Sequence, residues 1–259
     1  SVAPLQWHPL TAVNAPHENK LTFLIRDMGP GTWSNAVHKA ITAGKFGVPK
    51  ELELSVDVEH ADNPQLVRQS QSVSPQQNGA RTAFTMCVDG PYGNTVKCEH
   101  NVYVMIAGGI GITPLVSLYR QLYHLIRMRD SSVLHVKKVY LVWTVKYLAI
   151  LQPFIQSLNE IMSDEQVNAI FAKISLYVTN TRIEEQQNLD LLNPNDNTVQ
   201  VDFARVNLNW EFAKIAEEHH ADVLQSQVVA IVCGPQSLRR DVSKNCFKHN
   251  FIYREEMYH

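Results

Sequence analysis

The alternation of apolar runs with amphipathic segments from residue 101 onward is the feature that most constrains the fold. Four apolar runs have the length and composition of buried strands. They are residues 102–107, 139–144, 174–179 and 228–233. Helices are predicted at about 113–128, 148–162 and 210–219, and from 236 onward. Strand and helix repeated in this way predict an α/β domain, a parallel sheet with helices on both faces.

The first hundred residues have a different pattern. Short runs with β-branched and aromatic residues at 21–27, 51–58 and 81–88 are separated by turn residues, which predicts a small antiparallel barrel or sandwich. Residues 59–80 are rich in Gln, Ser, Asn and Pro and cannot supply a packed apolar face. We interpret them as a mobile surface insertion. Two domains are therefore expected, residues 1–98 and 99–259.

Composition narrows the classes of partner and site. A chain of 259 residues with 45% hydrophobic residues can bury two cores, and a formal net charge of -2 gives no reason to expect nucleic acid. The four cysteines form no CxxC pair, so we expect neither a structural metal nor a disulfide framework. The apolar runs are shorter than a membrane span, and we expect no signal peptide.

Residues 108–114 (GGIGITP) form a glycine turn between a predicted strand and a predicted helix. Thr113 is expected to cap the helix and Pro114 to occupy its first turn. The helix N-terminus would then offer N–H groups to a phosphate or another polar ligand group. Pro114 stands where the GxGxxG dinucleotide motif has its last glycine, and a purely structural turn remains the alternative.

A second turn, Cys233-Gly234-Pro235, follows the last apolar run. Because ligands of open α/β sheets bind at the carboxyl ends of the strands, this turn and the glycine turn are expected to converge on one crevice. The alternative for Cys233 is a buried small hydrophobic residue. A third turn, residues 89–93 (DGPYG), is by itself an ordinary tight turn.

Seven segments in one order resemble the dehydrogenase domains of ferric reductases and NADPH oxidases, within the ferredoxin–NADP reductase fold group. They are residues 7–11 (WHPLT), Arg26, residues 31–34 (GTWS), 90–93 (GPYG), 108–114 (GGIGITP), 209–210 (NW) and 233–235 (CGP). Residues 5–16, 88–93 and 107–114 look closest to ferric-chelate reductases. The resemblance implies an FAD-binding antiparallel β-barrel, here partial, followed by an NADPH-binding domain.

The resemblance also implies contacts with FAD. They are His8, Pro9 and Thr11 along the flavin, Arg26 on the pyrophosphate, and Trp33 and Ser34 in the turn beside the same diphosphate. Tyr258 is a candidate for the aromatic residue near the flavin that relatives often have at their C-terminus.

On the nicotinamide side the resemblance implies three groups of residues. They are Gly108, Gly109, Gly111, Thr113 and Pro114 around the pyrophosphate and ribose, Cys233 with Gly234 and Pro235 beside the nicotinamide, and Lys146 and Arg182 for a 2′-phosphate. The two cations favour NADPH, and NADH stays an alternative.

The implied activity is hydride transfer from NADPH to FAD and passage of single electrons onward. In relatives the next acceptor is haem in a membrane domain of the same polypeptide, and then ferric iron or oxygen. The chain itself is expected to be soluble, at the cytosolic face of that membrane. Two alternatives are a soluble flavin reductase that serves a protein partner and a module that senses NADPH without turnover.

Overall fold

The computed structural model describes residues 7–42, 51–57, 69–73, 84–88, 97–147, 150, 154–180, 199–219 and 227–256. The chain divides into two compact units, Ser1–Val96 and Lys97–His259. The predicted boundary lay after residue 98, close to this division. Each unit is described by itself below.

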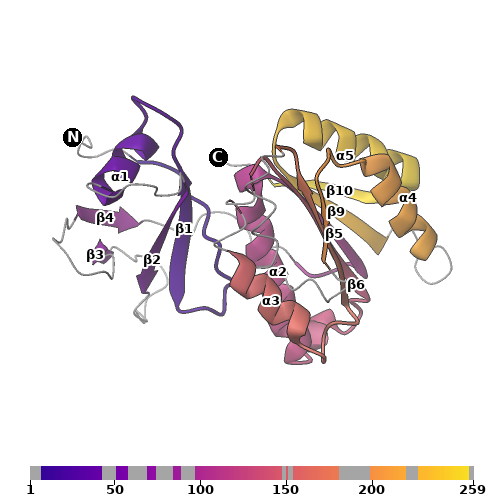
Figure 1. Ribbon diagram of the computed structural model, residues 1–259. Coiled ribbons are helices and arrows are strands. Elements are labelled where there is room, and N and C mark those ends of the chain that lie inside the picture. The colour runs from indigo at the N-terminus through magenta and orange to yellow at the C-terminus, as the bar shows by residue number, and fades with distance from the viewer. Residues whose placement is uncertain are drawn as a thin grey trace. The chain divides into compact units, whose positions relative to one another are not determined.

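Within its described residues, the first unit contains two antiparallel strand pairs and one helix (Figure 1). Strand β1 (Lys20–Arg26) pairs with β2 (Glu51–Asp57), and β3 (Gln69–Val73) pairs with β4 (Phe84–Val88). The apolar residues of β1 form much of the buried core, with Phe23 and Ile25 6% and 4% exposed. Helix α1 (Trp33–Thr42) was not predicted.

One expectation for this unit stays a prediction and another needs correction. The strands that the structure describes there pair two by two, with one further antiparallel bridge between Ala12 and Phe23, so the partial barrel is not confirmed and stays a prediction. Within the predicted insertion at 59–80, residues Gln69–Val73 form β3, because their backbone can pair with β4 although their side chains are polar. Residues 59–68 and 74–80 lie outside the described part of the chain.

The second unit is built on a six-stranded sheet whose order is β10-β9-β5-β6-β7-β8. Every neighbouring pair is parallel, which confirms the prediction. The strands are β5 (Val102–Gly108), β6 (Lys138–Val145), β7 (Phe171–Val178), β8 (Val199–Asp202), β9 (Val228–Cys233) and β10 (Ile252–Glu255). The edge strands β8 and β10 were not predicted, because each is four residues long and partly polar.

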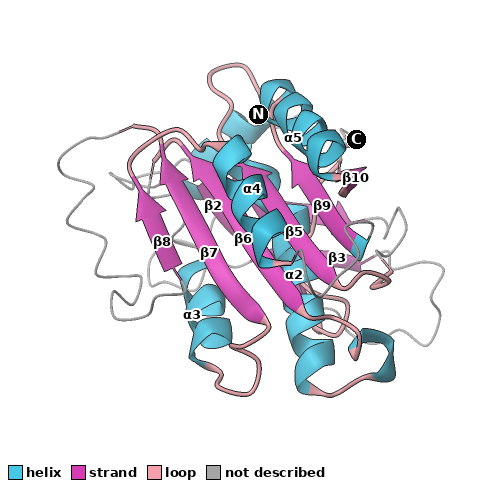
Figure 2. Ribbon diagram, turned by 90° about the vertical axis from the view of Figure 1, so that its right-hand side faces the viewer, coloured by secondary structure: helices cyan, strands magenta, loops and turns pink. Residues whose placement is uncertain are grey.

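Helices cover both faces of this sheet, as predicted (Figures 1 and 2). Helices α4 (Leu208–Glu218) and α5 (Gln236–His249) pack their apolar side chains against one face, where Phe212 and Val242 join the same buried cluster as Val104. Helices α2 (Ile112–Arg127) and α3 (Ile155–Ser163) lie on the other face. The helix predicted over 148–162 begins later than expected, at Ile155.

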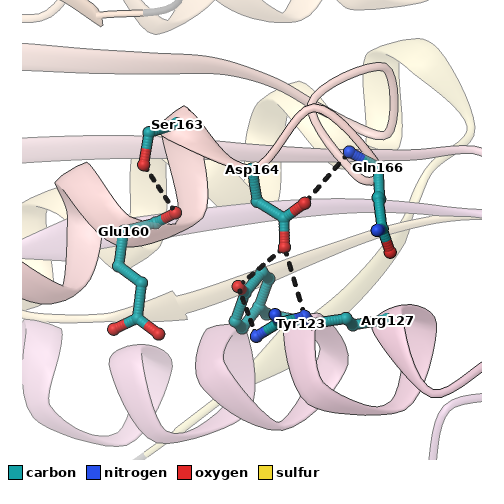
Figure 3. A network of polar contacts seen from close by, with 6 residues as sticks. All are labelled: Tyr123, Arg127, Glu160, Ser163, Asp164 and Gln166. Carbon is teal, nitrogen blue, oxygen red and sulfur yellow. Dashed lines mark hydrogen bonds and ion pairs between the residues drawn. The ribbon is translucent and has the colours of Figure 1, made fainter.

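A polar network ties the end of α2 to the connection between α3 and β7 (Figure 3). The Tyr123 hydroxyl donates to Asp164 Oδ2 over 2.9 Å, and Arg127 Nε lies 3.4 Å from the same oxygen. The Gln166 backbone N–H donates to Asp164 Oδ1 over 3.0 Å. This hydrogen bond is the largest cause of the lowered pKa of Asp164. These contacts fix the far end of the helix whose first turn follows the glycine turn.

Two kinds of feature are absent from the part of the chain that the structure describes. No helix within it is long and apolar enough to cross a bilayer. Across the same residues, no group of three or more His, Cys, Asp or Glu side chains is arranged to hold a metal ion.

Candidate functional site

The point where the strand order reverses lies between β5 and β9. From β5 the chain moves outward through β6 and β7 to β8, and then returns to place β9 on the other side of β5. Ligands of open α/β sheets bind outside the carboxyl ends of the strands at such a reversal. The glycine turn follows β5 and Cys233-Gly234-Pro235 follows β9, so both turns lie at this position.

The two turns touch each other. A Cβ atom added to Gly111 would stand 2.4 Å from the main-chain oxygen of Cys233, and one added to Gly108 would stand 2.6 Å from Cδ of Pro235. Gly234 in turn lies against the backbone of Gly108. The predicted convergence is therefore present, but at Gly108 and Gly111 it is the neighbouring turn, not a ligand, that excludes a side chain.

Gly109 is the glycine of this turn that leaves room for a ligand. Its φ of +56° is in the left-handed region, and no atom lies within 4 Å of the position of an added Cβ. Its carbonyl oxygen accepts a hydrogen bond of 2.9 Å from the indole N–H of Trp143 on β6. Trp143 was not among the predicted site residues, although the indole N–H of a tryptophan in a buried strand needs a hydrogen-bond acceptor.

The start of α2 differs from the prediction at Thr113. A short 3₁₀ turn, Gly109–Gly111, runs directly into α2, so Gly111 is the cap residue and makes no side-chain capping bond. Thr113 is already inside the helix and 2% exposed, and its hydroxyl donates to the carbonyl of Ile110 over 3.2 Å. Pro114 lies in the first turn as predicted. The predicted capping of α2 by Thr113 is therefore wrong, because the cap position is occupied by Gly111.

Cys233 is the last residue of β9, and its side chain is buried, with 1% of the residue exposed. The backbone N–H of Glu256 donates to the carbonyl of Val232 over 2.9 Å, which keeps Glu256 beside the last residues of β9. Burial raises the pKa of Glu256, and the positive charge of Arg254 opposes that rise. Tyr258 lies outside the described residues.

Lys146 follows β6 at the same edge of the sheet and is exposed. Its Nζ lies 5.2 Å from the ring centroid of Tyr147, within the range of a cation–π contact. The backbone N–H of Asn180, after β7, donates to the carbonyl of Lys146 over 3.2 Å. A cation therefore stands at the carboxyl end of β6, and Arg182 lies outside the described residues.

In the first unit, a hydrogen-bonded turn joins β1 to α1. Asp27 Oδ1 accepts from the backbone N–H of Gly29 over 2.8 Å and from the side chain of Asn35 over 3.0 Å. Thr32 Oγ1 accepts from the backbone N–H of Asn35 over 3.2 Å, so Thr32 is the N-cap of α1. The hydroxyl of Ser34 accepts from the backbone N–H of Met28 over 3.1 Å.

Three of the predicted flavin-side residues meet at this turn. The rings of His8 and Trp33 stack with centroids 4.2 Å apart and planes 20° apart, and Ser34 follows Trp33 in the first turn of α1. Arg26 ends β1 immediately before Asp27. Pro9 is exposed and Thr11 half-buried in the segment that leads to β1. Asp27 and Asn35 were not predicted, and Thr32 was quoted in the 31–34 segment without its capping role, although a threonine ahead of an amphipathic segment is a helix-start signal.

Two family models together match nearly the whole chain. Residues 100–247 match the model of the ferric reductase NAD binding domain. The chain belongs to this family. Residues 1–96 match the model of an FAD-binding domain. The family resemblance of the motifs is thereby confirmed, as is the order of an FAD-binding domain before an NAD-binding domain.

NADPH oxidases are among the relatives of the chain. It is 24% identical to a superoxide-generating NADPH oxidase heavy chain of Dictyostelium discoideum, over 96% of this chain and 33% of that protein. It is 28% identical to NADPH oxidase 3 of Rattus norvegicus, over 95% of this chain and 39% of that protein. Among solved structures, the chain is similar to a flavohemoglobin from Malassezia yamatoensis with bound FAD and heme, with a TM-score of 0.42 and 13% sequence identity. The match covers 81% of this chain and 44% of the flavohemoglobin chain. The chain spans between a third and two fifths of the length of these two oxidases.

Proposed function

We propose that this chain is the dehydrogenase part of a flavoprotein of the NADPH oxidase or ferric reductase type, which passes hydride from NADPH to FAD. The observation that carries the proposal is the contact between the turns after β5 and β9 at the reversal of the strand order. This contact builds a glycine-lined surface at the place where α/β sheets bind nucleotides.

The residues of the second unit fit a nicotinamide nucleotide. The open left-handed position at Gly109 and the start of α2, where Gly111 supplies no side-chain cap, suit the diphosphate, because helix N-termini attract anions. Lys146, one strand away, suits the 2′-phosphate that distinguishes NADPH from NADH. Gly234 and Pro235 in the second turn would border the nicotinamide with Cys233.

The turn between β1 and α1 fits the FAD diphosphate. Thr32 caps α1, and Asp27, Asn35 and Ser34 fix the turn by hydrogen bonds, so the backbone is already ordered before a ligand arrives. Arg26 would pair with the diphosphate through its planar guanidinium. His8, Pro9 and Thr11 would run along the flavin, with His8 anchored on Trp33.

When both cofactors are bound, they supply the redox chemistry, hydride leaving C4 of the nicotinamide for N5 of the flavin. The protein orients them and excludes water, and no side chain has to act as an acid or base in that step. Electrons would then go singly to haem in a membrane part of the full polypeptide, from the cytosolic face, and from there to ferric iron or oxygen.

The test is an anaerobic titration of the purified chain with FAD and then NADPH, followed by flavin fluorescence and absorbance. We expect FAD to bind and NADPH to bleach it, and Gly111→Glu to abolish bleaching while FAD binding persists. Phe247→Gln is the matched control, since Phe247 is 91% exposed on α5. Binding of both cofactors without bleaching of the flavin would favour a sensing module. A chain that binds neither FAD nor NADPH would refute the proposal.

A further inference from the structure

Trp143 has a hydrogen bond that the strand and helix structure does not require. The residue lies near the end of β6 and is 0% exposed. Its ring meets Phe154 edge to face, with centroids 5.4 Å apart and planes at 89°. A buried indole N–H needs an acceptor, and here the acceptor is the carbonyl of Gly109 in the glycine turn.

The sheet register explains how Trp143 reaches this carbonyl. Trp143 is paired with Ala107 on β5, so its side chain stands beside the strand that leads into the turn. Gly109 follows two positions later, in a left-handed conformation whose outer side is open. The hydrogen bond therefore draws the Gly109 carbonyl toward the protein interior on one side of an otherwise open position.

The direction of this carbonyl matters for an anionic ligand. A carbonyl oxygen carries partial negative charge, and one that faced a diphosphate would repel the phosphate oxygens. In a trans peptide the C=O and the following N–H point in opposite directions, so a donor that holds the carbonyl also helps to hold the whole peptide between Gly109 and Ile110. The backbone N–H of Ile112 also donates to the Gly109 carbonyl within the 3₁₀ turn, and the indole N–H adds a second donor from the neighbouring strand.

We propose that Trp143 is a positioning residue for the nicotinamide nucleotide: its indole N–H holds the Gly109 carbonyl away from the bound diphosphate. The inference rests on the proposed function, because it presumes that the diphosphate binds at this turn. It adds a residue that touches neither cofactor and acts through the backbone of the turn.

The test compares Trp143→Phe with the unaltered 259-residue chain by calorimetric titration with two ligands, NADP⁺ and adenosine 2′-monophosphate. Phenylalanine keeps an aromatic ring against Phe154 and removes the N–H. We expect NADP⁺ to bind about fivefold to tenfold more weakly, as the loss of one hydrogen bond predicts. The affinity for adenosine 2′-monophosphate, which has no diphosphate, stays unchanged. In turnover, KM for NADPH rises and kcat changes little.

Phe154→Leu is the matched control. It removes the edge-to-face packing around Trp143 and keeps the N–H, so a destabilised protein with unaltered NADP⁺ affinity is expected. If Trp143→Phe does not fold, β-(3-benzothienyl)alanine at position 143 replaces the N–H by sulfur at nearly constant shape.

Each of three results would overturn the inference: unaltered NADP⁺ affinity without the N–H, an equal loss for both ligands, or an equal loss in Phe154→Leu. If the unaltered chain binds no NADP⁺ at all, the proposed function itself fails.

Discussion

Gly111 lies against the main-chain carbonyl of Cys233, so close that a Cβ at position 111 would stand 2.4 Å from that oxygen. The two residues come from turns that follow different strands, and the strands are neighbours only in the folded sheet. The reason for glycine at 111 is thus a contact between two turns, and the shape of the surface at the carboxyl ends of β5 and β9 depends on that contact.

Gly111→Ala is expected to push the turns apart. We expect a loss of about 1–3 kcal/mol in the free energy of unfolding, as overpacking typically costs, and a large fall in NADP⁺ affinity. Gly31→Ala is the control, since Gly31 has a φ of +86° but open space around it, in the first unit. The Gly31→Ala variant should lose stability through backbone strain alone, and its NADP⁺ affinity should be unaltered. Equal NADP⁺ affinity in Gly111→Ala and the unaltered chain would contradict the prediction.

Lys146→Ser is expected to lower the preference for NADPH. Removing the cation at the end of β6 should raise the Kd for NADPH roughly tenfold through loss of a charge-assisted hydrogen bond, and leave the Kd for NADH unaltered. Lys244→Ser removes a cation that pairs with Asp241 on α5 and serves as the control. Parallel changes in the two Kd values would show that Lys146 does not contact the 2′-phosphate.

Thr32→Ala is expected to weaken FAD binding through the N-cap of α1. Loss of the bond from the Asn35 N–H to Thr32 Oγ1 should cost about 1 kcal/mol in the stability of the first unit. Thr32→Ser retains the oxygen and should restore both stability and FAD affinity. Fluorescence titration with FAD measures the effect, and a serine variant as weak as the alanine variant would contradict the capping role.

His249→Phe is expected to flatten the pH dependence of stability. Burial lowers the pKa of His249, and the charge of Lys248 adds to the effect. Because the unfolded chain keeps a pKa of about 6.5, it binds more protons than the folded chain as the pH falls below about 7, and the free energy of unfolding decreases. Phenylalanine keeps a ring against Phe212 and Phe251 and cannot titrate.

Urea unfolding at about pH 7 and about pH 5, on either side of the ordinary histidine pKa, measures this difference. The slope should be reduced but not abolished, because burial also lowers the pKa of His100. If the pH dependence of the free energy of unfolding is the same in His249→Phe as in the unaltered chain, a group other than His249 causes it.

The sequence by itself determined the architecture of the second unit and the family. Buried parallel strands are continuous apolar runs, so residues 102–107 and 228–233 were recognisable without a structure. The ordered motifs likewise identified the FAD and nicotinamide domains that the family models confirm. These signals are local in the chain, and each can be read within a few residues.

Only the tertiary structure decided how those residues work together. Gly111 is required by Cys233, and Gly109 is held by Trp143, a residue 34 positions away. Strand β3 exists because β4 offers backbone partners, although its own side chains predict no strand. Contacts of this kind join atoms distant in sequence, so no local pattern carries them, and they become defined when the sheet sets its register.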